Sequence, residues 1–119
     1  MRLKGYSSTQ LPVPIGVQNL VIRDYCRRRG HEYSMSDVEF LQGHHVLQGM
    51  VWYIHEFDGI CAYSMACLPA DEELRDLILE AYSDKEIHLA LEGYVLPRDR
   101  TICETIWKLK EIINDSPAA

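Results

Sequence analysis

A short apolar run near the middle of the chain, Gly59-Ile60-Cys61-Ala62-Tyr63-Ser64, constrains the fold most strongly. The run consists of small and apolar residues between turn-forming residues, which is typical of a strand buried on both faces of a parallel sheet. Such a strand requires helices on both sides of the sheet. With 119 residues the chain has room for one domain of this kind, so we assign residues 1–119 to a single α/β domain.

The rest of the sequence alternates between strand-like and helix-like patterns. The predicted strands cover about residues 2–6, 31–35, 59–64 and 87–91. The predicted helices run from about Val17 to Gly30, over residues 37–57 from a capping box at Ser36-x-x-Glu39, from Asp71 along Leu74, Leu77, Ile78 and Ala81, and from a capping box at Thr101-x-x-Glu104 along Ile102, Ile106, Leu109 and Ile113. Strands that are each followed by a helix predict a four-stranded parallel sheet with helices on both faces, flavodoxin-like or resolvase-like.

The charge balance argues against nucleic acid as a partner. Eighteen acidic residues and twelve basic residues give a formal net charge of -6, whereas phosphate neutralisation requires a basic surface. The run Arg27-Arg28-Arg29 could be taken for a basic patch. It directly precedes Gly30, however, and cations in a last helical turn followed by glycine are typical of a helix C-terminus.

The sequence predicts a soluble cytoplasmic protein without metal or cofactor. Its four cysteines form no CxxC pair, and no run approaches the roughly 20 apolar residues of a membrane span. The chain contains no GxGxxG, Walker or HExxH motif and no nucleophile elbow. His44 and His45 are adjacent, so on a helix their side chains would point about 100° apart and would not share one ion easily.

Candidate site residues follow from the rule that open parallel sheets bind ligands beyond the carboxyl ends of their strands. We expect polar residues after the predicted strands, together with those near the start of the first helix, to form one cleft. The candidate catalytic residues are Ser8, Asp37 and Glu92. The candidate ligand-binding residues are Ser7, Gln18, Asn19, Arg23, Tyr63 and Ser64.

Each of these assignments has a structural alternative. Ser7 and Ser8 are either a nucleophile or anion-binding hydroxyl, or part of a polar turn. Asp37 and Glu39 could form an acid and base pair, but the capping box also accounts for them. Arg23 is either a surface side chain or a guanidinium that binds a carboxylate or phosphate, and we expect the latter.

The order Tyr6-Ser7-Ser8-Thr9, a helix ending Tyr25-Cys26-Arg27-Arg28-Arg29-Gly30, a buried strand and a further helix resembles the catalytic domain of serine recombinases. That family has a tyrosine, an arginine and a nucleophilic serine at the end of strand one, and more arginines after strand three. Here the arginine beside the serine is absent, and the stretch from Ser64 to Pro69 contains none. The resemblance implies the fold and leaves DNA strand exchange as a remote alternative.

The chain also resembles the sporadic carbohydrate cluster proteins of bacterial sugar-biosynthesis gene clusters. The matching blocks are Val17-Gln18-Asn19-Leu20-Val21-Ile22-Arg23-Asp24-Tyr25-Cys26, Tyr63-Ser64 with Leu68-Pro69, and Leu89-Ala90-Leu91-Glu92. This resemblance implies a role in making an unusual sugar or a sugar-containing secondary metabolite.

We therefore expect an enzyme that acts on an activated sugar, such as a nucleotide-sugar, without a redox cofactor, as an isomerase, epimerase or lyase. The alternative is a noncatalytic partner or regulator of a biosynthetic enzyme. We also expect a homodimer, because Trp107, Ile112, Met50 and Trp52 lie outside the main apolar stripes of their predicted helices.

Overall fold

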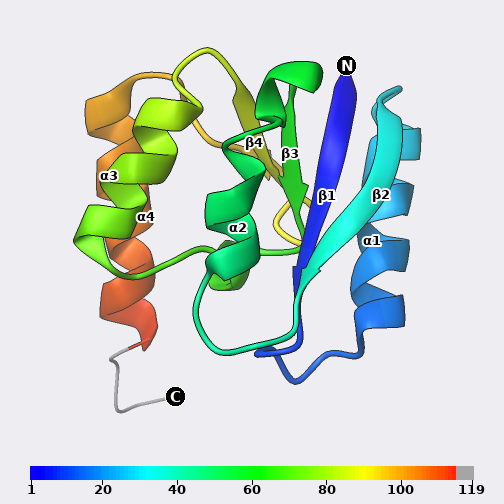
Figure 1. Cartoon of the computed structure of the whole chain (residues 1–119), viewed down its shortest axis with the longest axis horizontal. Coiled ribbons are helices and arrows are strands. Elements are labelled where there is room, and N and C mark those ends of the chain that lie inside the picture. The colour runs from blue at the N-terminus through cyan, green and yellow to red at the C-terminus, as the bar shows by residue number, and fades with distance from the viewer. Residues whose placement is uncertain (115–119) are drawn as a thin grey trace.

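The computed structural model describes residues 1–114 of the chain (Figure 1). Its elements, in chain order, are β1 (Arg2–Ser8), α1 (Ile15–Arg28), β2 (Glu32–Glu39), α2 (His45–Met50), the 3₁₀ turn η1 (Ile54–Glu56), β3 (Gly59–Ala62), the 3₁₀ turn η2 (Met65–Cys67), α3 (Glu72–Ala81), β4 (Glu86–Leu89), β5 (Tyr94–Val95) and α4 (Arg100–Asn114). No helix within these residues is long and apolar enough to cross a bilayer.

The α/β class is confirmed, but the predicted four-stranded parallel sheet is wrong in one respect. The described sheet has five strands in the order β2-β1-β3-β4-β5, and β5 runs antiparallel to β4. The segment expected to be a plain connection after Leu91 turns back at Gly93, whose φ of 64° is in the left-handed region that favours glycine. The turn brings Tyr94 opposite Leu89, which adds the fifth strand.

The structure differs most from the sequence prediction at residues 36–57. The predicted capping box at Ser36 and Glu39 is instead the end of β2, where Asp37 pairs with Tyr6 and Glu39 pairs with Ser8 of β1. Pairing with β1 satisfies the backbone N–H and C=O groups that would otherwise have formed hydrogen bonds within a helix. Helix α2 begins only at His45 and ends at Met50.

Two of three helix ends are as the sequence predicts. Helix α1 ends before Gly30, whose φ is 73°. At the start of α3 the side chain of Asp71 accepts a hydrogen bond from the amide of Leu74 at 2.9 Å. At α4 the capping group is Asp99, which accepts from the amide of Ile102 at 3.0 Å, so the box predicted from Thr101 is wrong.

The two faces of the sheet are covered differently. Helix α1 packs against β1 and β2 on one face, whereas α2 lies in front of the sheet in Figure 1 and α3 and α4 lie toward its β4 side. Trp107 of α4 is fully buried, and its Nε1 donates to the carbonyl oxygen of Pro69 at 2.7 Å. Trp107 therefore packs within its own chain and does not form the surface expected for a dimer. The side chains of Leu109, Ile112 and Ile113 lie outside the described residues.

Candidate functional site

The carboxyl ends of β1, β3 and β4 lie side by side, as the parallel sheet predicts. The amide of Tyr63 donates to the carbonyl oxygen of Tyr6 at 2.9 Å, and the amide of Leu91 donates to that of Tyr63 at 2.8 Å. The residues that follow these strands therefore share one edge of the sheet, and α1 begins at the same end (Figure 1). This edge holds most of the predicted site residues.

Ser8 and Gln18 form a tight pair at this edge. The amide of Ser8 donates to Oε1 of Gln18 at 3.0 Å, and Nε2 of Gln18 donates to the carbonyl oxygens of Ser8 and Val13, both at 2.8 Å. Both residues are buried. The Ser8 hydroxyl accepts from the amide of Gln10 at 3.2 Å. Gln18 thus fastens the connection between β1 and α1, and the Ser8 hydroxyl supports a turn.

A second pair joins Ser7 to Asn19. The buried hydroxyl of Ser7 donates to Oδ1 of Asn19 at 3.1 Å. The structure therefore brings together four of the predicted residues, two from β1 and two from the first turns of α1. Their contacts are mutual, which is the behaviour of a packed polar joint between a strand and a helix.

Ser64 and Glu92 form a third pair beyond β3 and β4. The hydroxyl of Ser64 donates to Oε2 of Glu92 at 2.8 Å, and the amide of Met65 donates to the same oxygen at 2.9 Å. Tyr63, which directly precedes Ser64 in the sequence, is buried. Glu92 itself is exposed, so its carboxylate is held from one side and open to solvent from the other.

Asp37 lies elsewhere, on β2 and level with Tyr6. Its carboxylate accepts a hydrogen bond from the hydroxyl of Tyr53 and lies 3.6 Å from Nζ of Lys4. The structure does not bring Asp37 together with Ser8 and Glu92.

Glu39, two positions after Asp37 on β2, is buried. Its carboxylate accepts from the hydroxyl of Tyr6 at 2.8 Å and from the amides of Val46 and Leu47. Burial, and then the bond to Glu39, raises the pKa of Tyr6 far above its usual range.

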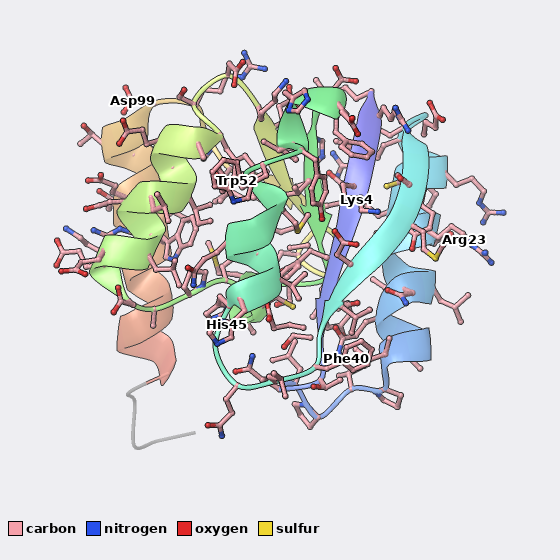
Figure 2. All side chains as sticks on the ribbon, in the orientation of Figure 1. Lys4, Arg23, Phe40, His45, Trp52 and Asp99 are labelled. Carbon is pink, nitrogen blue, oxygen red and sulfur yellow. The ribbon has the colours of Figure 1, made fainter. Side chains whose placement is uncertain are left out.

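Arg23 points away from the strand ends. The side chain is exposed and projects outward from α1 (Figure 2). With Asn19 and Tyr33 it lines a shallow depression of about 190 Å³. The expected neighbourhood of Asn19 and Arg23 on one helix face is thus present, and anion binding by Arg23 stays a prediction.

A larger polar cavity of about 470 Å³, which the sequence prediction does not include, lies between the end of α1 and the turn after β4. Its lining residues are Tyr25, Arg28, Arg29, His31, Ala90, Leu91, Glu92 and Gly93. Arg29 spans it, because its guanidinium lies 4.8 Å from the centre of the Tyr25 ring and donates to the carbonyl oxygen of Gly93 at 2.9 Å. The signal for this cavity in the sequence is the run Arg27-Arg28-Arg29, which its interpretation as a helix end does not connect with a binding site.

The charged side chains that line this cavity are of both signs, with Glu92 as the carboxylate. Two guanidinium groups, Arg28 and Arg29, line it, and Arg28 is partly neutralised by Asp24 at 2.9 Å. Burial raises the pKa of Tyr25, an effect that Arg29 opposes, so the phenol stays protonated at neutral pH. Among the described residues no cluster of three or more potential metal-ligating side chains is present.

One solved structure, the N-terminal catalytic domain of TP901-1 integrase, is similar to this chain over 97% of its length and 95% of the other chain, with a TM-score of 0.66 and 14% sequence identity. The fold is therefore resolvase-like. At this identity the likeness shows the fold alone. No family model matches the sequence, and no curated protein matches it.

The likeness confirms the fold implied by the resemblance to serine recombinases. The resemblance to the sporadic carbohydrate cluster proteins gains no support from these comparisons. At the edge where the recombinase family has its nucleophile, the hydroxyls of Ser7 and Ser8 are buried in the mutual pairs described above.

Proposed function

We propose that the chain is an enzyme of unusual-sugar or sugar-containing metabolite biosynthesis, and that it acts on an activated sugar without a redox cofactor. The isomerase, epimerase and lyase classes fit this proposal. The observation that carries it is the polar cavity between α1 and the β4–β5 turn, where Glu92 lies together with Arg28 and Arg29. Ligand binding in this cavity is the first step of the proposal.

The chemistry of the lining suits a nucleotide-sugar. Guanidinium groups bind phosphate oxygens with paired hydrogen bonds, and a carboxylate such as Glu92 accepts hydrogen bonds from sugar hydroxyls. A volume of about 470 Å³ lies within the range of small-molecule sites, roughly 300 to 1,000 Å³. The aromatic ring of Tyr25 adds an apolar wall on which a sugar ring can pack.

The residues that resemble the carbohydrate cluster proteins also flank this cavity. Tyr25 belongs to the first block and Glu92 to the last, and both line the cavity although 67 positions separate them in the sequence. The two blocks are thus brought to one place by the fold. This convergence supports a role that is tied to the cavity.

The test is a titration of the ¹⁵N-labelled protein with UDP-glucose and GDP-mannose, followed by ¹H–¹⁵N NMR. We expect shifts at Arg28, Arg29 and the turn at Glu92 and Gly93, and changes of the sugar signals if the ligand is converted. Arg28→Ala should weaken binding about tenfold, the value of one charge-assisted contact. The absence of any shift with either ligand would contradict the proposal.

A matched variant separates the two candidate anion sites. Arg23→Ala removes the same charge from the exposed depression on α1. Binding in the polar cavity predicts an unchanged affinity for this variant, whereas the sequence prediction that Arg23 binds the anion predicts a loss. If Arg23→Ala weakens binding while Arg28→Ala does not, the anionic group lies in the depression beside Asn19.

A second candidate function, a noncatalytic partner or regulator of a biosynthetic enzyme, is favoured by large exposed apolar side chains. Phe40 and Leu41 are each 71% exposed and Trp52 is 84% exposed. Phe40 and Trp52 are labelled in Figure 2. Apolar side chains that form one exposed patch are typical of protein contacts, and Phe40 and Leu41 are adjacent in the sequence. The expected homodimer is proposed through Trp52 in place of the buried Trp107. Light scattering tests it: a mass near 13.8 kDa would refute the dimer, and a larger mass that falls with Trp52→Glu would support it.

A further inference from the structure

A chain of hydrogen bonds runs from α1 through β4 behind the polar cavity. The hydroxyl of Tyr25 lies 2.6 Å from Nδ1 of His88, and Nε2 of His88 lies 2.9 Å from Oε1 of Glu86. Tyr25 and His88 are each 2% exposed. Tyr25 lines the cavity, whereas His88 and Glu86 are not among its lining residues. The chain of hydrogen bonds therefore begins at a residue that lines the cavity, passes through the buried His88 and ends at the partly exposed Glu86.

The direction of the protons follows from the partners. Glu86 is a carboxylate and only accepts, so Nε2 of His88 carries a hydrogen and donates to it. In a neutral imidazole Nδ1 is then the acceptor, and the hydroxyl of Tyr25 donates to it. Burial lowers the pKa of His88, which agrees with a neutral ring. The phenol thus has a base within reach, and that base has an orienting carboxylate.

The surroundings hold this geometry in place. The ring of His31 packs against that of His88 at 5.1 Å between centroids, with the planes 75° apart. Glu86 is also 3.5 Å from Arg98, which fixes the carboxylate from its outer side. Arg29 lies over the ring of Tyr25. These contacts restrict the rotation of all three members of the chain.

We propose that Tyr25 is the proton-transferring residue of the cavity, with His88 as its proton acceptor and Glu86 as the positioning residue. The proposal rests on the proposed function for its substrate class, a hydroxyl-bearing activated sugar. A ligand hydroxyl gives its proton to the Tyr25 oxygen while the phenolic proton of Tyr25 passes to Nδ1 of His88. The products are a ligand alkoxide and an imidazolium paired with Glu86, and the reverse step returns both protons. This relay of protons, with His88 as the base and the Glu86 carboxylate as its orienting group, requires no metal and no oxidant.

The first test uses 4-nitrophenyl acetate, which reports an activated phenol whatever the natural ligand is. The Tyr25 oxygen attacks the acetyl carbonyl, nitrophenolate leaves, and the phenolic proton goes to His88. We expect acetylation at Tyr25, located by peptide mass spectrometry, to be at least tenfold faster than at Tyr94, although Tyr94 is 41% exposed and Tyr25 only 2%. His88→Gln should reverse this order. Rates that follow exposure in the wild-type protein would overturn the proposal.

The second test needs no variant to fold. ¹⁵N NMR of the imidazole groups in the wild-type protein at pH 7.5 should show His88 neutral with its hydrogen on Nε2. A hydrogen on Nδ1, or a charged ring, would overturn the relay. Neither test uses a sugar ligand, so a failure here is distinguishable from a failure of nucleotide-sugar binding. The matched control is Tyr33→Phe, which removes a half-buried hydroxyl bonded to Ser36 and should change neither result.

Discussion

Replacing Glu39 by glutamine should lower the free energy of unfolding by about 3 kcal/mol. The carboxylate is 1% exposed and accepts from the Tyr6 hydroxyl at 2.8 Å, from the Val46 amide at 2.9 Å and from the Leu47 amide at 3.3 Å. Hydrogen bonds to a charged group contribute about 1.5 to 3 kcal/mol, against about 1 kcal/mol for neutral ones. Glutamine removes the charge and also directs an NH₂ group at groups that donate, which leaves one buried donor unsatisfied at about 1 to 3 kcal/mol.

The assay is urea unfolding at pH 7, monitored by tryptophan fluorescence and circular dichroism. We expect the urea concentration at the midpoint to fall. The slope of the unfolding free energy against urea concentration should stay the same, because the surface area exposed on unfolding does not change. Glu32→Gln is the control, since that side chain is exposed and should change stability by less than about 0.5 kcal/mol. A Glu39→Gln protein as stable as the control would show that these bonds do not hold the start of α2 onto β1 and β2.

A double-mutant cycle separates the contribution of Tyr6 from that of the amides. Tyr6→Phe alone leaves the amides of Val46 and Leu47 on the carboxylate and should cost about 1 to 2 kcal/mol. Because Tyr6 and Glu39 are in direct contact, the two losses should not add, with a coupling of about 1 kcal/mol or more. Additive losses would mean that the Tyr6 hydroxyl contributes nothing through Glu39.

Three further expectations follow from the fold. Gly59→Ala should lower the free energy of unfolding in urea by about 3 kcal/mol, because a Cβ would collide with the backbone carbonyl of Glu86. Gly49→Ala, with open space around it, should be neutral or slightly stabilising, and equal effects would be inconsistent with the pairing of β3 with β4. Burial lowers the pKa of His88, so below about pH 6.5 the unfolded chain binds a proton that the folded protein does not. The free energy of unfolding should therefore fall by about 1.4 kcal/mol per pH unit as the pH drops to the folded pKa, and His88→Gln should flatten this dependence in unfolding measured from pH 7.5 to 5. Duplex DNA should migrate unretarded at near-physiological salt, and retardation that Ser8→Ala abolishes would contradict this.

The parts of the fold that depend on residues close together in the sequence, or on the general topology of parallel sheets, could be predicted from the sequence. The run from Gly59 was identified as a buried strand, and β3 is buried at every position from Gly59 to Ala62. The carboxyl-edge rule also placed Ser64 near Glu92, 28 positions away, and the two side chains are hydrogen-bonded. The first result follows from the pattern of apolar residues along the chain, and the second from the rule that the carboxyl ends of parallel strands share one edge of the sheet.

The errors arise where distant contacts decide between two locally acceptable structures. The sequence Ser36-x-x-Glu39 fits a capping box, but pairing with β1 makes it a strand, and the carboxylate of Glu39 then binds amides of α2 from outside that helix. The polar cavity was missed for a related reason. Arg29 and Gly93, which close it, are 64 positions apart, and neither has a pattern that indicates the other.

The hydrogen bonds at the end of β1 are a reason to propose ligand binding at the polar cavity and not at Ser7 or Ser8. A reaction at Ser7 or Ser8 would first have to break bonds to Asn19 or to the turn at Gln10, in a buried place where each unsatisfied group costs about 1 to 3 kcal/mol. At the cavity the guanidinium of Arg28 and the exposed side of Glu92 already face solvent. A ligand can therefore replace water there without opening the joint between β1 and α1. The fold thus separates a polar joint between β1 and α1 from the polar cavity in which we propose that the ligand binds.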